Sequence, residues 1–222
     1  MKRTVVVFIM IFFALSLTGC KSAIEKREAN LSELREEVLV GGDEAVKITL
    51  SSGIRENPFV IDGTPSQERM EFSVVTVEGD FGGEQELSYT LRSGEKTYEG
   101  KLTKHPFKDS YSVEISERTL AFAAFTLSGS NFAGNYELKS VKTEETISAT
   151  EAVEIAEERL KNSIKKFSDG GKINAELYVR LIKNPISAEE GYFWYVAYAP
   201  EKYTVYAVLI NSSTRDIVAV RE

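Results

Sequence analysis

The chain has 222 residues, 42% of them hydrophobic and 27% charged, so a packed core in one or two domains is expected and extensive disorder is not. The net charge is −7, or −9 without Lys2 and Arg3, and phosphates repel an acidic chain, so a nucleic-acid partner is disfavoured. One cysteine and one histidine, Cys20 and His105, cannot build an internal disulfide or a Cys/His metal site. No catalytic residue, metal ligand or cofactor is assigned.

The first 19 residues have the layout of a secretory signal peptide. Lys2 and Arg3 form a short positive region, and an apolar run follows from Val5 to Leu17. This run is shorter than the roughly 20 apolar residues that a membrane-spanning helix needs. The four residues Leu17-Thr18-Gly19-Cys20 end the segment and resemble the lipobox of bacterial lipoproteins.

In that family the cysteine thiol receives a diacylglyceryl group, and cleavage leaves the cysteine as the new N-terminus. Small side chains at Thr18 and Gly19 let a protease approach the backbone, and Cys20 supplies the soft nucleophile for thioether formation. Two or more acyl chains hold a protein stably on a membrane, whereas one chain binds only marginally. The resemblance implies that membrane lipid anchors the chain through Cys20 on the extracytoplasmic side of a bacterial cell membrane. The alternative is an ordinary signal peptide, or an uncleaved anchor, with an incidental cysteine.

Residues 20–44 are rich in charged side chains and are interpreted as a lipidated N-terminus and tether. Asn30 and Glu33 fit a helix capping box. The apolar residues that follow recur at helical spacing: Leu31, Leu34 and Val38. The pattern predicts a helix of about two or three turns that ends at Gly41-Gly42. A spacer above the bilayer is favoured over a helix that docks a partner.

Residues 45–142 alternate between apolar and polar side chains with a period of two, as half-buried strands do. Clear examples are Val46–Leu50, Met70–Val74 and Leu87–Leu91. Short strands separated by glycine-containing turns predict an antiparallel β-sandwich of immunoglobulin-like size. No complete catalytic motif stands in this segment; for example, Ser128-Gly-Ser130 lacks the Gly-x-Ser-x-Gly pattern of a nucleophile elbow.

Residues 148–222 read as one helix followed by four strands. Ser148 and Glu151 fit a capping box, and the helix that they open places its apolar side chains on one face. The strand-like segments are Ala175–Lys183, Tyr192–Ala199, Tyr203–Ile210 and Ile217–Val220. Sequential hairpins predict an antiparallel sheet with one helix across it, an α+β module.

This module resembles the PepSY family over residues 148–222. The resemblance rests on Glu151–Ala156, on Tyr195-Val196, and on Tyr206–Asn211 leading through Thr214 to Ile217-Val218. Asn211 and Arg215 stand where the family usually has Asp and Gly. The resemblance implies a module that binds or inhibits peptidases or regulates envelope proteins without being catalytic.

Both faces of the predicted C-terminal sheet are apolar, and one helix covers only one of them. The other face must be covered by the β-rich segment, by a second copy of the chain in a homodimer, or by a partner protein or peptide. Tyrosine and tryptophan suit recognition surfaces. The candidate partner-binding residues are therefore Trp194, Tyr198, Tyr203 and Tyr206.

The sequence thus predicts a signal peptide (1–19), a lipidated tether (20–44), a β-sandwich-like domain (45–142) and a PepSY-like α+β domain (148–222). We expect a membrane-anchored, non-enzymatic binding or regulatory module with an envelope protein or peptide as partner. One alternative is an envelope hydrolase with paired carboxylates, whose two acids need not be close in sequence. The other is a structural or assembly subunit.

Overall fold

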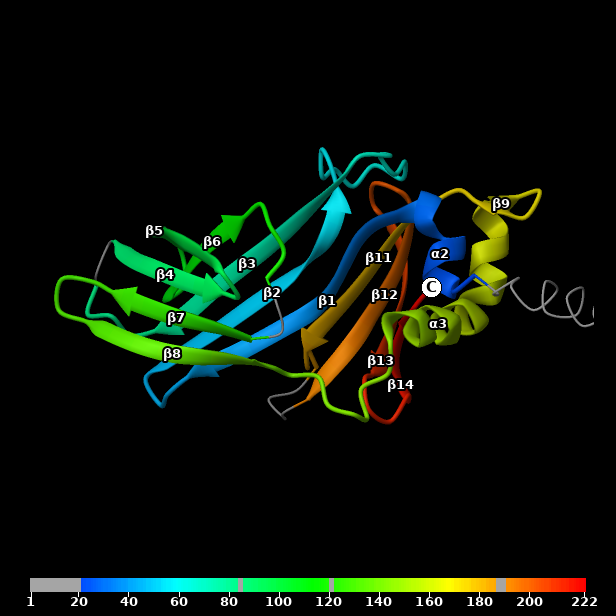
Figure 1. Cartoon of the computed structure of the whole chain (residues 1–222). Helices are drawn as coiled ribbons and strands as arrows, with labels where there is room; N and C mark the ends of the chain where they lie inside the picture. The colour runs from blue at the N-terminus through cyan, green and yellow to red at the C-terminus, as the bar shows by residue number, and fades with distance from the viewer. Residues whose placement is uncertain (1–20, 84–85, 120–121, 187–190) are drawn as a thin grey trace, which may run out of the picture.

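The computed structural model describes residues 21–222 except 84–85, 120–121 and 187–190 (Figure 1). The main sheet has 12 strands in the order β14-β13-β12-β11-β1-β2-β3-β6-β5-β4-β7-β8. Two short strands, β9 (Ser168–Asp169) and β10 (Lys172–Ile173), form a separate hairpin. No helix among the described residues has both the length and the apolar composition to cross a membrane.

Eight strands of the main sheet close into an antiparallel barrel. They are β1 (Leu31–Gly42), β2 (Val46–Glu56), β3 (Arg69–Gly79), β4 (Leu87–Ser93), β5 (Lys96–Lys104), β6 (Ser110–Ile115), β7 (Phe122–Ser128) and β8 (Ala133–Ser140). The barrel closes where β8 pairs with β1, with Ser140 opposite Leu39 and Lys139 opposite Val40. Large apolar side chains fill the interior, including Leu50, Phe125, Leu127 and Leu138.

The expected β-sandwich is therefore wrong. Alternation of apolar and polar residues requires one buried and one exposed face per strand, and a sandwich and a barrel both meet that requirement. What distinguishes them is the pairing of the first strand with the last. Here that pairing joins β1, which precedes the segment 45–142, to β8 at its end.

Strand β1 occupies the segment that was expected to be helical. The helical turn that does form is earlier, at α2 (Ala23–Lys26), where Ser22 and Glu25 make a capping box, and the 3-10 turn η2 (Glu28–Asn30) follows. Asn30 caps no helix, because its side-chain nitrogen donates hydrogen bonds to the carbonyl oxygens of Ile173 and Ala175, both at 2.8 Å. The helical expectation for residues 30–42 is wrong because pairing along both edges of β1 outweighs local spacing.

Strand β1 belongs to both halves of the molecule. One edge pairs with β2 along its length. The other edge is divided: residues Leu31–Arg35 pair in parallel with β11, and Leu39 and Val40 pair with β8. A register shift between Arg35 and Glu37 marks the change of partner. We call this point the fork, because the barrel and the C-terminal sheet separate there (Figure 1).

The C-terminal strands and helix lie close to their predicted positions. The strands are β11 (Glu176–Lys183), β12 (Tyr192–Glu201), β13 (Thr204–Asn211) and β14 (Ile217–Arg221), and successive strands pair antiparallel. Helix α3 (Ala149–Ile164), followed by the 3-10 turn η3 (Lys165–Phe167), packs against β12 and β13. The predicted capping box of Ser148 and Glu151 is confirmed, with both reciprocal hydrogen bonds present.

The second face of the C-terminal sheet lies under the loop between β2 and β3, residues 57–68. The ring of Phe59 meets that of Tyr178 edge-on, with centroids 6.3 Å apart. Ile61 lines a cavity of about 70 Å³ together with Tyr195 and Ala199. The backbone N–H of Asp62 donates to Glu176 Oε1 at 3.4 Å. The β-rich segment therefore covers this face, as in one of the three alternatives that the sequence analysis left open.

Candidate functional site

Two of the four predicted partner-binding residues, Trp194 and Tyr198, are fully buried beneath α3, each 0% exposed. Trp194 Nε1 donates to the carbonyl oxygen of Ile147 at 3.0 Å. The Tyr198 hydroxyl donates to Glu157 Oε1 at 2.6 Å, and burial, followed by the Glu157 charge, raises the pKa of Tyr198 well above its usual value. Both side chains hold the helix on the sheet and present no surface to a partner in this fold.

The other two predicted residues lie apart from each other. Tyr206 is half-buried, with its ring 5.2 Å from that of Phe167. Tyr203 is 83% exposed in the turn between β12 and β13. The four residues therefore form no common surface. Cys20, the predicted lipidation site, lies outside the described residues.

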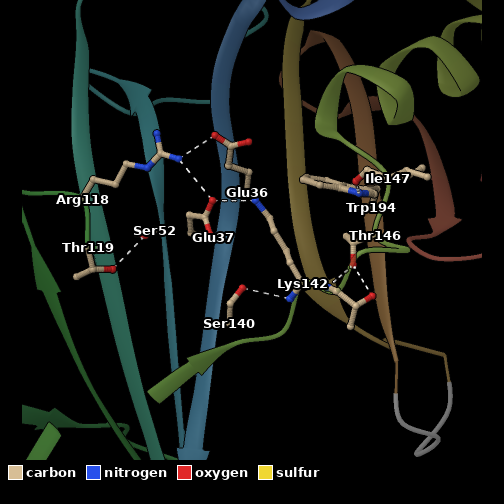
Figure 2. Close-up of polar contacts among 11 residues, drawn as sticks. Glu36, Glu37, Ser52, Arg118, Thr119, Ser140, Lys142, Thr146, Ile147 and Trp194 are labelled. Atoms are coloured by element: carbon tan, nitrogen blue, oxygen red, sulfur yellow. Dashed lines mark hydrogen bonds and ion pairs between the residues drawn. The ribbon is translucent and has the colours of Figure 1, made fainter. Parts of the chain in front are cut away.

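A cluster of ionic side chains lies at the fork (Figure 2). Arg118, in the connection between β6 and β7, contacts Glu36 Oε1 at 2.8 Å and Glu37 Oε1 at 3.8 Å. Lys142, which follows β8, donates to Glu37 Oε1 at 2.8 Å. Figure 2 shows that Arg118 and Lys142 approach β1 from opposite sides. Each carboxylate is neutralised by a cation, so the cluster joins three segments and is not arranged for acid–base chemistry.

Three further glutamates are buried near the start of β1, the end of β2 and the start of β11. Glu33, Glu56 and Glu176 are 0%, 1% and 0% exposed, respectively. Glu33 accepts hydrogen bonds from Arg35 Nε and Arg180 Nε, both at 2.7 Å. Sequence reasoning missed these acids; the available signal is a glutamate on the buried side of a predicted strand.

Glu56 and Glu176 hold the loop 57–68. Glu56 Oε2 accepts from the backbone N–H of Ser66 at 2.6 Å, while its Oε1 has no hydrogen-bond partner in the structure. Glu176 Oε2 accepts from the Tyr178 hydroxyl at 2.9 Å. Burial is the main cause that raises the pKa of Glu176, and the hydrogen bonds that it accepts oppose this effect. Both acids accept hydrogen bonds from the backbone of the loop that covers them. Because they are buried beneath this loop, a substrate has no access to them.

A cavity of about 450 Å³ lies between the α2–η2 segment, the loop 57–68 and the chain around β10. We call it the basic cavity, because its lining residues include Lys26, Arg27 and Lys172 and no acid. Arg27 is already bound, since its Nε donates to Glu157 Oε1 at 2.6 Å. Lys26 and Lys172 are exposed. In the described part of the chain, no group of three or more His, Cys, Asp and Glu side chains could hold a metal ion.

In the described sheet β14 is the terminal strand, so no strand pairs with its outer edge. All five of its residues are exposed, and the large apolar ones, Ile217, Val218 and Val220, are 40%, 42% and 36% exposed. Ile217 and Val220 lie opposite Ile210 and Val208, which belong to the core under α3. The sequence predicted this strand but not its place at the end of a continuous sheet.

Ion pairs fix β14 beside α3. Arg215 Nη2 contacts Glu151 Oε1 at 3.0 Å, and Arg159 Nη1 contacts Glu222 Oε1 at 2.8 Å. The pairs lie at the two ends of the strand, whose extended backbone is paired with β13 on its inner edge. An edge of this kind offers N–H and C=O groups to an extended segment of another chain.

No family model matches this chain, and no curated protein or solved structure matches it either. The resemblances to bacterial lipoproteins and to the PepSY family therefore rest on the residues quoted for them. The functional argument rests on those residues and on the geometry of the fold.

Proposed function

We propose that this chain is a lipoprotein, anchored through Cys20 on the extracytoplasmic side of a bacterial membrane, and that it is a non-enzymatic binding module. Its site is the outer edge of β14, and its ligand is an extended segment of an envelope protein. The signal-peptide layout and the lipobox-like residues 17–20 support the anchor. The open edge of β14 supports the binding mode.

The observation that carries the binding proposal is the composition of the outer edge of β14. Natural edge strands commonly avoid pairing by means of lysine, proline, bulges or a covering segment. The residues Ile217–Val220 contain neither lysine nor proline, and their side chains are exposed, although the register with β13 shifts once, at Val218. Barrel closure pairs β8 with β1, so the opposite end of the described sheet offers no such edge.

A second copy of the chain is the competing occupant of this edge, because strands related by a twofold axis pair antiparallel. The crosslinking experiment distinguishes it from an envelope protein.

The test is photo-crosslinking in intact cells from position 218 of the lipidated chain, with position 122 as the matched control. Val218 and Phe122 are both exposed apolar residues on strands, and Phe122 lies on the barrel, 52% exposed. We expect crosslinks from position 218, mapped to one extended segment of one envelope protein, and none to that segment from position 122.

Substitution gives a second readout of the same proposal. Val218→Lys should reduce recovery of that partner about tenfold or more, because a charged edge resists strand pairing, and Phe122→Lys should leave recovery unchanged. Equal effects of the two substitutions would contradict edge binding. Crosslinks only between copies of this chain would replace the proposed partner with a homodimer.

A further inference from the structure

The folded part begins close to the proposed anchor. Ser22 is already the N-cap of α2, so two residues separate Cys20 from the first helical turn. An extended chain spans at most about 3.5 Å per residue. If acyl chains on Cys20 lie in the bilayer, α2 lies within roughly 10 Å of that attachment point. The chain therefore has no long tether, and one particular end of the molecule must face the membrane surface.

The elements at that end are α2, the last part of α3, and the β9–β10 hairpin. Figure 1 shows them together, with the barrel strands β4, β5, β7 and β8 at the opposite end. Contacts fix the arrangement: Arg27 binds Glu157 of α3, and Asn30 binds the backbone at Ile173 and Ala175. The membrane-facing end thus follows from the fold.

This end carries exposed cations on a chain whose net charge is negative. Five exposed lysines there take part in no ion pair that the structure describes: Lys21, Lys26, Lys165, Lys166 and Lys172. The acids at this end are Glu25, Glu28, Glu157, Glu158 and Asp169, and the loop 57–68 beside the basic cavity adds Asp62 and Glu68. Three of these seven are engaged locally, because Glu25 caps α2, Glu157 binds Arg27, and Glu158 contacts Lys161. Five lysines and four acids remain outside these contacts, so this end is slightly positive on a chain whose net charge is −7.

The basic cavity opens at the same end. Its lining brings Lys26 and Lys172 together with the backbone of Gly63-Thr64 and Gly171, without an acid. Its volume of about 450 Å³ is ample for a phosphate group with its glycerol. Lysine ammonium groups bind phosphate as point charges.

We propose that this end of the molecule docks on anionic phospholipid headgroups of the membrane that holds Cys20, with a headgroup phosphate seated in the basic cavity between Lys26 and Lys172. The inference rests on the proposed anchor for its location. The attraction between clustered lysines and anionic lipids supplies the physical basis. Docking orients the molecule, so that the barrel end, opposite the basic cavity, faces away from the bilayer.

The test uses residues 20–222 with Cys20→Ser, the mature chain without acyl groups, so that the anchor itself contributes nothing to binding. Binding is measured by cosedimentation with phosphatidylcholine vesicles that contain either no phosphatidylglycerol or about 30% of it. We expect binding only to the anionic vesicles, and its loss at high salt. Lys26→Gln/Lys172→Gln should weaken this binding about 30-fold, which corresponds to about 1 kcal/mol for each lysine near a charged surface.

The matched control is Lys47→Gln/Lys108→Gln, which removes two exposed lysines from the barrel. This control should bind like the unsubstituted chain. Equal loss in both double variants would overturn the proposal, because it would show a response to net charge alone. Binding of inorganic phosphate without any binding to anionic vesicles would also overturn it. Acyl labelling of Cys20 in cells is a separate measurement, so a failed anchor and a failed docking surface give different results.

Discussion

The buried acid Glu176 makes the free energy of unfolding depend on pH. Its carboxylate lies under the loop 57–68, and burial is the largest of the causes that raise its pKa. A raised pKa means that the folded state favours the protonated form, so ionisation at neutral pH lowers the free energy of unfolding. This reduction in the free energy of unfolding is absent below the unfolded-state pKa of about 4.3 and is complete above the folded-state pKa.

We therefore expect Glu176→Gln to increase the free energy of unfolding relative to the unsubstituted chain at pH 7.5. The increase should shrink as the pH falls through the folded-state pKa, since the unsubstituted side chain then becomes neutral as well. Urea denaturation at pH 7.5 and pH 4.5 measures the difference. Glu99→Gln, at an exposed position on β5, is the control and should show no such trend. A larger stability loss in Glu176→Gln at pH 7.5 than at pH 4.5 would contradict the assignment.

At the residue scale, the capping pair Ser148 and Glu151 was predictable because the spacing of the two residues determines it. The lipidation of Cys20 stays a prediction from local sequence. The roles of Trp194 and Tyr198 were not predictable. Their alternation along the strand indicates which face they share, but only the packing of α3 shows that this face is closed.

At the element scale, Ser148 determines where α3 begins. Its side chain accepts a hydrogen bond from the backbone N–H of Glu151, and Glu151 reaches back to the N–H of Ser148. Ser148→Ala should lower the free energy of unfolding by about 1 kcal/mol, whereas Ser148→Asp, which keeps an acceptor, should lower it much less. Urea denaturation followed by far-UV circular dichroism measures both. A loss as large in Ser148→Asp as in Ser148→Ala would show that the cap is not the cause.

Local sequence signals determine helix α3, whereas long-range pairing determines strand β1. Helix α3 carries a cap, an apolar stripe and a lysine in its last turn, and all of these favour the same structure. In β1, the apolar spacing of Leu31, Leu34 and Val38 favours a helix, yet the segment pairs with β2, β8 and β11. Two of those three partners are more than 90 residues away in sequence, so the decisive interactions are invisible locally.

At the scale of the whole molecule, β1 couples the barrel to the C-terminal sheet. Leu39 lies in the barrel interior at 0% exposure, and the only tryptophan, Trp194, lies under α3 in the other half. Because both halves share one strand, we expect a single unfolding transition. Leu39→Ala should lower the free energy of unfolding by about 3 kcal/mol, to the same extent by Trp194 fluorescence and by far-UV circular dichroism.

Two separate transitions, or a Leu39→Ala effect that Trp194 fluorescence does not report, would show that the halves unfold independently.

The long-range pairing of β1 also explains why the barrel was not predicted from the sequence. Alternation predicted most of its strands, but closure depends on the pairing of β1 with β8, which brings together the two ends of a segment of more than 100 residues. Local pattern carries no information about that contact.

Both proposals depend on lipidation of Cys20, because an acylated Cys20 is what places the β14 edge outside the cell and the basic cavity beside the bilayer. The most direct test is metabolic labelling with a clickable fatty acid in a bacterial host, comparing the full chain with its Cys20→Ser variant. We predict that the full chain is labelled and sediments with membranes, and that the variant carries no label. An unlabelled full chain, or equal labelling of the variant, would contradict the central claim.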